Sequence, residues 1–232
     1  TLIILGSIVL NHEIIFRWTS SASVLIRLYF TLLFTIGMEF VARYEHRLWH
    51  SRFLWFIHAS HHHQKTKFLA GPSKNDAECN TFVSEQKMEL NDIFPVIFAS
   101  IATFVLWKCS EPSSMLHDIC FGSACGISIY GTSYFIGHDL CAHERCGEGV
   151  AKFLKQQFPT MAHCAEIHSR YHHRIKKDIS DEDDPYGEPY GFWLGPQEVQ
   201  FSKETGKELG MPTVLKSCFY FGGLFTLGAI FR

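Results

Sequence analysis

Residues 118–143 read DICFGSACGISIYGTSYFIGHDLCAH, an apolar run that ends in two histidines spaced as H-x4-H. A membrane-spanning helix needs about 20 mostly apolar residues, and residues 118–137 meet that length. The glycines in the run suit close contact between helices in lipid. A buried core helix of a soluble protein is the alternative interpretation. The stretch therefore predicts a span that carries histidines to one face of a membrane.

Three further apolar runs, at residues 1–16, 22–43 and 93–110, complete a predicted four-helix transmembrane bundle. The second run and the run quoted above are long enough to span, whereas the first and third are marginal alone. We expect an all-α fold in which residues 1–213 form one integral-membrane domain. Residues 214–232 are a further apolar segment that could span, lie in the interface or dock on the bundle.

The composition limits the classes of protein to which this chain can belong. A chain of 232 residues fits one domain, and 21 Phe residues are more than a soluble domain of this size needs. The net charge of −2 and the lack of a Lys/Arg block argue against a nucleic-acid partner. The 8 cysteines form no C-x-x-C pair, which favours free thiols over a disulfide framework. Because the chain starts at Thr1, we expect a preceding stretch that carries any targeting signal.

The basic residues predict which way the chain lies in the membrane. The polar stretches 43–92 and 138–213 emerge on the same side if the two runs between them both span. These stretches hold 7 and 9 Lys and Arg residues, whereas only Arg17 and Lys108 lie near the opposite loops. Cytoplasmic loops carry such an excess of positive charge. We therefore expect the face with these stretches to be cytosolic, or stromal in a plastid.

Histidine is the outlier of the composition, with 14 copies, most of them in four clusters on this same face. Residues three or four apart share one face of a helix, so each cluster can aim its imidazoles at one point. Imidazole is the commonest metal-ligand side chain, and one ion would take three or four of them, so this number indicates two ions. The predicted metal ligands are His46, His50, His58, His61, His62, His138, His143, His168, His172 and His173.

The residues around the clusters narrow the chemistry. The cysteines lie outside these motifs, so neither a thiolate zinc site nor an iron–sulfur cluster is indicated. Many imidazoles fit non-haem iron acting on O₂, with zinc and copper as alternatives. Asn91, Asp92 and Asp139 are candidates to orient a histidine by accepting its other N–H; a helix cap or a solvated carboxylate is the alternative. Glu39, inside an apolar run, is expected to pair with Arg43.

Several blocks of sequence extend the pattern beyond the histidines. They resemble the beta-carotene 3-hydroxylases, the carotenoid branch of the membrane-bound, non-haem di-iron fatty acid hydroxylase/sterol desaturase superfamily. The similarity covers roughly residues 30–200. The blocks are GMEFVARYEHR at 37–47, ELND at 89–92, Y-G-x6-H-D-x3-H at 130–143 and PYGFWLGP at 189–196.

This resemblance implies hydroxylation of the beta-ionone ring of carotenoids at C3, from beta-carotene through beta-cryptoxanthin to zeaxanthin, with O₂ and two electrons. It implies two non-haem iron ions, with no catalytic side chain beyond the metal ligands. The apolar carotenoid would enter from the lipid bilayer, and ferredoxin with its reductase would supply the electrons. A plastid membrane is expected if the source is a photosynthetic eukaryote.

Two clusters depart from the spacing of that family. The first pair is H-x3-H where H-x4-H is expected, and the last cluster is H-x3-H-H where H-x2-H-H is expected. Ser169 therefore occupies an expected ligand position; we expect His168 to replace it, with His163 in reserve. Alternative functions are a related hydroxylase or desaturase of a sterol, fatty acyl or sphingoid lipid, a carotenoid C4 ketolase or hydroxylase, and a metal transporter.

Overall fold

The computed structural model describes residues 21–62, 89–111, 113–173 and 187–209, and in these ranges every regular element is a helix. The prediction of an all-α fold is confirmed for this part of the chain. The predicted first span and the apolar segment 214–232 lie outside the described residues. A bundle of four spans thus stays a prediction.

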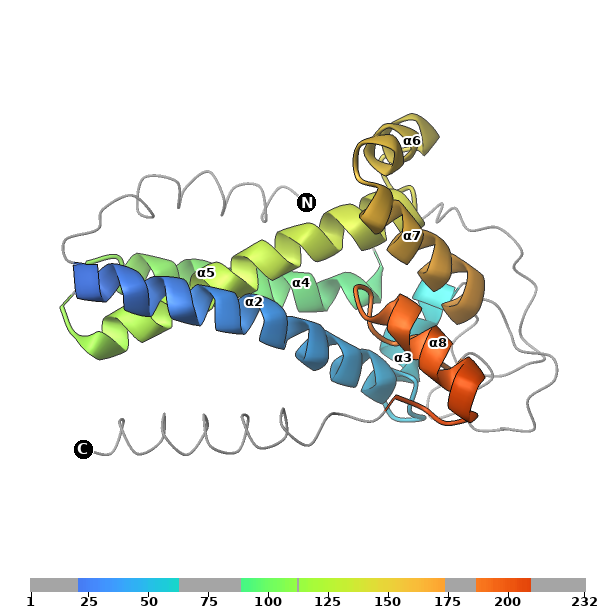
Figure 1. Cartoon of the computed structure of the whole chain (residues 1–232), viewed down its shortest axis with the longest axis horizontal. Coiled ribbons are helices and arrows are strands. Elements are labelled where there is room, and N and C mark those ends of the chain that lie inside the picture. Colours follow the sequence, from blue (N-terminus) through green and yellow to red (C-terminus); the bar gives the residue numbers. More distant parts are fainter. Residues whose placement is uncertain (1–20, 63–88, 112, 174–186, 210–232) are drawn as a thin grey trace.

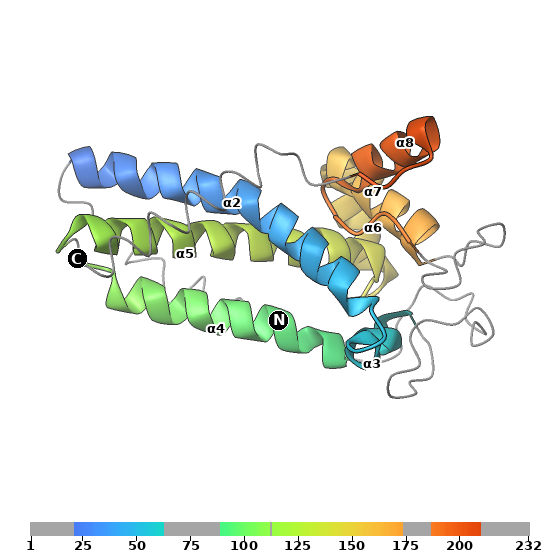
Figure 2. The same cartoon turned by 90° about the horizontal axis from the view of Figure 1, so that it is seen from below.

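Three long helices run side by side along the longest axis of the molecule (Figures 1 and 2). They are α2 (Ser21–Trp49), α4 (Ile93–Lys108) and α5 (Met115–Tyr134), and α5 continues as the π-helix η4 (Phe135–Ala142). All three are long and apolar enough to cross a membrane. They correspond to three of the four predicted spans.

The contact between α2 and α5 depends on small residues, as the sequence predicted. A Cβ atom added at Gly122 would lie 2.5 Å from the main-chain oxygen of Arg27, and one at Gly126 would lie 2.5 Å from that of Thr31. The backbones are therefore too close for any larger side chain. Gly131 has open space around its Cα, so it does not serve this contact.

The outer faces of the long helices carry large apolar side chains. Leu25, Leu32, Ile101, Phe104 and Ile129 are all exposed, at 51–67% of their surface. A soluble protein rarely leaves so continuous an apolar surface in water, whereas lipid-facing helices require one. The pattern supports a membrane as the surroundings of this bundle.

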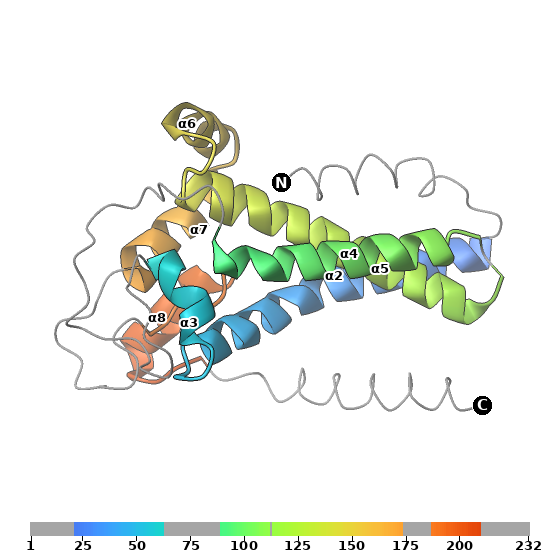
Figure 3. The ribbon, with the colours of Figure 1, turned by 180° about the vertical axis from the view of Figure 1, so that it is seen from behind.

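Short helices form a cap at one end of the long ones (Figures 1 and 3). This cap is the predicted histidine-rich region, and it is assembled from four separate parts of the sequence. Its elements are α3 (Trp55–His58), η1 (Ala59–His62), η3 (Leu90–Asp92), α6 (Glu148–Gln157), α7 (Pro159–Ile167), η5 (His168–His172) and α8 (Gly195–Thr205).

Candidate metal centre

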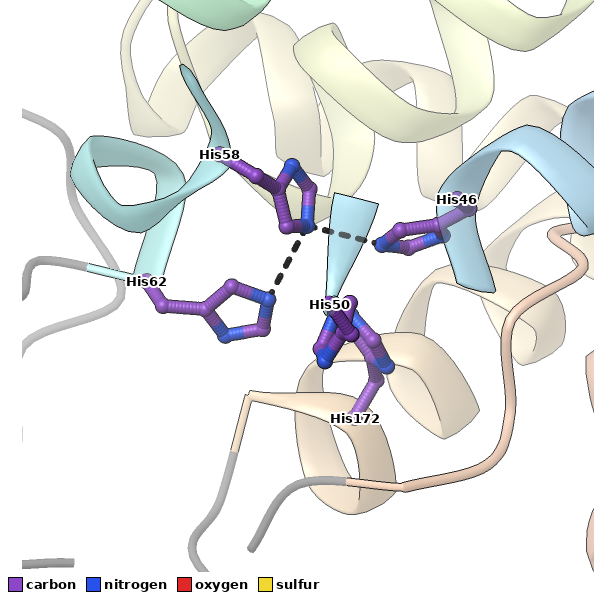
Figure 4. A group of neighbouring side chains, drawn as sticks. All are labelled: His46, His50, His58, His62 and His172. Atoms are coloured by element: carbon purple, nitrogen blue, oxygen red, sulfur yellow. Dashed lines mark hydrogen bonds between the residues drawn. The ribbon is translucent and has the colours of Figure 1, made fainter. Parts of the chain in front are cut away.

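Nine of the ten predicted ligand histidines fall into two buried groups. Within each group every histidine offers a ring nitrogen, and these nitrogens lie within 4.8 Å of one another. The first histidine group is His46, His50, His58, His62 and His172, drawn in Figure 4. The second histidine group is His61, His138, His143 and His168.

Ordinary helical spacing builds most of the first group. His46 and His50 lie one turn apart at the end of α2, and His58 and His62 have the same i, i+4 relation across α3 and η1. His172, from η5, completes the group. Figure 4 shows the five rings turned toward one another. The short first cluster, H-x3-H, is thus the spacing that a helix needs to present both imidazoles on one face.

Two π-helical turns place the histidines of the H-x4-H cluster that begins at His138 and of the H-x3-H-H cluster that begins at His168. The His143 N–H donates to the His138 carbonyl at 3.0 Å, and the His173 N–H donates to the His168 carbonyl at 3.4 Å, both across five residues. In an α-helix, residues i and i+5 point roughly 140° apart. The wider π turn brings them back together and is frequent at functional sites. The additional residue in H-x3-H-H is accommodated by this turn.

The tenth histidine, His173, lies between the two groups. Its ring centroid is 4.6 Å from that of His62 in the first group and 4.6 Å from that of His143 in the second. Its Nε2 is 3.1 Å from Nε2 of His168. His163, the reserve ligand, is exposed on α7 and joins neither group. The structure therefore brings His168 to the site and leaves His163 outside it.

Main-chain and amide oxygens orient three histidines of the first group. The Nδ1 atoms of His46 and His172 lie 2.7 Å and 3.2 Å from the carbonyl oxygens of Tyr190 and Gly187. Nδ1 of His58 lies 2.9 Å from Oδ1 of Asn91. These oxygens can only accept, so each Nδ1 carries the proton and donates it outward. The lone pair of each Nε2 then points into the group.

Carboxylate oxygens orient two histidines of the second group. Nδ1 of His61 donates to Oε2 of Glu89 at 3.2 Å, and Nδ1 of His138 donates to Oδ2 of Asp139 at 3.3 Å. The opposite nitrogens, Nε2 of His61 and Nε2 of His138, are buried and make no hydrogen bond. A metal-binding histidine has this arrangement, with its other N–H held by an oxygen outside the centre.

The structure places the three predicted supporting residues differently. Asn91 and Asp139 contact histidines. Asp92 contacts Arg145 and caps its own turn. Glu89 was missed as a histidine partner, although the ELND block pointed to it. The carbonyls of Tyr190 and Gly187 were missed because a main-chain oxygen leaves no signal in the sequence.

The close approach of the nitrogens fits a bound cation. Nε2 of His58 lies 2.9 Å from Nε2 of His46 and 3.2 Å from Nε2 of His62. Two lone pairs facing each other at 2.9 Å repel, whereas ligands at right angles around a metal, with bonds of about 2.1 Å, are about 3 Å apart. The nitrogen donor set fits iron, zinc or copper.

Burial also favours the protonation state that binds metal. It lowers the pKa of His58, His61 and His62 well below the usual range, and neighbouring imidazoles lower it further. Burial acts in the same direction on His168 and His172. A lowered pKa keeps the imidazole neutral, with a lone pair free for a metal ion.

A buried polar network holds the segment that supports the first group. Oε1 of Glu39 accepts from the Leu194 N–H at 2.8 Å, and its other oxygen accepts from the Tyr130 hydroxyl at 2.7 Å. Arg43 forms ion pairs with Glu188, at 2.9 Å, and with Glu198. The predicted pairing of Glu39 with Arg43 is therefore wrong, because both residues bind the 187–198 region instead. The network fixes the carbonyls that face His46 and His172.

Curated relatives resemble this chain over most of its length. Beta-carotene hydroxylase 1, chloroplastic, of Capsicum annuum is 33% identical over 166 residues, which are 71% of this chain and 42% of the relative. Beta-carotene 3-hydroxylase 1, chloroplastic, of Arabidopsis thaliana is 32% identical over 178 residues, 75% of this chain and 47% of the relative. The resemblance inferred from the sequence blocks is confirmed.

A bacterial protein extends the comparison. The beta-carotene hydroxylase of Pseudescherichia vulneris is 31% identical over 114 residues, 49% of this chain and 52% of the relative. This chain thus spans about half the length of the curated relatives that it matches. No family model and no solved structure matches it.

Proposed function

We propose that this chain, a homologue of the beta-carotene hydroxylases, is a membrane enzyme that hydroxylates the beta-ionone rings of carotenoids. It acts at C3 and converts beta-carotene through beta-cryptoxanthin to zeaxanthin, with O₂ and two electrons. One observation carries the proposal: two buried histidine groups lie at the end of three apolar helices.

In this proposal each histidine group holds one iron ion, and His173 stands between them. A bound pair of non-haem iron ions supplies the oxidising power that an unactivated C–H bond requires. The chain's own residues supply orientation and exclude water. The Nδ1–H groups bind outward oxygens and fix the imidazoles, and burial of the histidines keeps solvent from the centre.

The position of the centre supports an apolar substrate with a reactive end. The groups are built at the ends of α2 and η4, where the apolar helices meet the polar cap. A long apolar molecule in the bilayer can present a terminal ring there without leaving lipid. A metal transporter instead holds its ion near the middle of the membrane, so this position favours the enzyme.

The proposed location follows from the names of the relatives, and the proposed electron donor from the resemblance of the sequence blocks. The plant proteins are named as chloroplastic. We propose a plastid membrane, with the histidine cap on the stromal side and ferredoxin with its reductase as the donor. The excess of Lys and Arg on the cap side of the sequence supports this orientation.

Pigment chromatography of bacteria that accumulate beta-carotene tests the proposal, with the chain, without it and with His61→Ala. Beta-cryptoxanthin and zeaxanthin should appear with the wild-type chain only. C4-oxidised products would change the assigned position on the ring. Unchanged beta-carotene, despite iron-loaded protein in the membrane, would contradict the proposed substrate and favour a sterol, fatty acyl or sphingoid lipid.

A further inference from the structure

Arg145 lies outside both histidine groups but contacts the carboxylates that support the second one. Its Nη1 is 2.7 Å from Oδ1 of Asp92, its Nη2 is 3.3 Å from Oε2 of Glu89, and its Nε is 3.0 Å from Oδ1 of Asp139. The guanidinium side chain is only 13% exposed. One cation thus holds three carboxylates from two separate parts of the chain.

Two of these carboxylates also bind histidines. Oε2 of Glu89 accepts from Nδ1 of His61, and it is the same oxygen that faces Arg145. Oδ2 of Asp139 faces His138, and its Oδ1 faces Arg145. Nη1 donates a hydrogen bond to Asp92, and the positive charge of the buried guanidinium attracts both histidine-bound carboxylates and thereby limits their positions. Arg145 is therefore connected to His61 and His138 through one residue each.

In the described part of the chain, the oxygens that orient histidines of the first group come from elsewhere. Nδ1 of His46, His172 and His58 faces oxygens of Tyr190, Gly187 and Asn91, respectively. Asn91 lies on η3, next to Asp92, but the hydrogen bond from the Glu89 main-chain N–H to Oδ2 of Asp92 holds that turn without the arginine. Loss of the guanidinium would thus leave the carbonyl and amide supports in place.

We propose that Arg145 is a positioning residue for the second histidine group, and that its loss weakens the binding of one metal ion while the other stays bound. The inference rests on the two-metal centre of the proposed function. Without the guanidinium, three neighbouring carboxylates repel one another, and Glu89 and Asp139 turn away from His61 and His138. Both imidazoles then lose the bond that sets their direction. Changes in such supporting partners typically weaken metal binding about 10- to 100-fold.

Iron retention by the purified full-length chain in detergent tests this role. Wild type and Arg145→Gln are loaded anaerobically with ⁵⁷Fe(II), passed over a chelating column, and measured for iron per chain and by Mössbauer spectroscopy. Wild type should keep two ions in two signals, and Arg145→Gln should keep one ion and lose one signal. The iron content of Arg145→Lys should fall between these values. An ammonium keeps the positive charge, but it lacks the planar shape that lets the guanidinium approach three carboxylates.

Lys155→Gln is the matched control. It removes the same charge from a neighbouring ion pair, Lys155 with Glu144 at 3.1 Å, and should keep both ions. Retention of both ions by Arg145→Gln, or equal loss of both, would overturn the inference. If Arg145→Gln does not accumulate as a folded protein, Arg145→Lys decides in the same assay, and retention of both ions as in the wild type would again overturn it. A wild-type chain that binds no iron would instead contradict the proposed function.

Discussion

The two histidine groups offer the same imidazole donors but have different supports. The first is oriented by two carbonyl oxygens of the segment that Glu39 and Arg43 bind, and by the amide oxygen of Asn91. The second is oriented by the carboxylates of Glu89 and Asp139, which converge on a single arginine. A neutral support and an anionic support make two chemically distinct sites. Histidine spacing alone therefore does not make the two sites equivalent.

Removal of one ligand from each group should give the largest effect. His58→Ala in the first group and His61→Ala in the second should each lower zeaxanthin formation by at least about 100-fold, because a lost ligand costs more than a lost supporting partner. Pigment chromatography measures the effect. Exposed His163→Ala is the matched control and should keep its activity. Activity in either buried variant would contradict the assignment of that group.

The support of the first group should be broken next. Arg43→Gln removes the cation from the buried carboxylate of Glu198 and should destabilise the protein by about 3–5 kcal/mol. Thermal unfolding in detergent measures this change. Arg47→Gln is the control, because its ion pair with Glu208 is about half exposed and contributes little. Equal melting temperatures of the two variants would show that the buried network does not hold the cap.

Substitution of Asn91 can give the first group an anionic support like that of the second group. Asn91→Leu removes the acceptor for Nδ1 of His58 and should weaken iron binding about 10- to 100-fold. Asn91→Asp restores an acceptor of the anionic kind found in the second group and should retain both ions. Iron per chain after chelator treatment separates the variants. If Asn91→Leu binds iron as tightly as wild type, the amide does not orient His58.

The smallest effect is expected where the sequence departs from the family spacing. Deletion of Ser169 converts H-x3-H-H into H-x2-H-H and removes the residue that the π turn accommodates. An α-helical turn can then place the same three imidazoles on one face. The variant should keep both ions and activity within about tenfold of wild type, since the ligand set is unchanged. Loss of iron would mean that the π turn itself is required.

The sequence was sufficient for the parts of the molecule that follow α-helical spacing or apolar length. The three long apolar helices and the i, i+4 pairs His46/His50 and His58/His62 are examples. The sequence could not specify the π turns at His138 and His168, because no residue type marks an i→i+5 hydrogen bond.

Long-range supports were the harder part of the site. Arg145 meets Glu89 and Asp92 across more than 50 residues of chain, and Arg43 meets Glu198 across 155. Local pairing rules instead favoured Glu39 with Arg43, which are neighbours on one helix. In the folded chain both side chains are buried, and each binds a partner that is distant in the sequence instead. Such long-range partners become visible only in the folded structure.

The iron content of the purified wild-type chain tests the central claim most directly. Two buried groups with inward lone pairs should hold two iron ions per chain after exhaustive removal of loosely bound metal, with nitrogen neighbours in X-ray absorption spectra. A chain that holds one ion or none under anaerobic loading, while correctly folded by circular dichroism, would contradict the account.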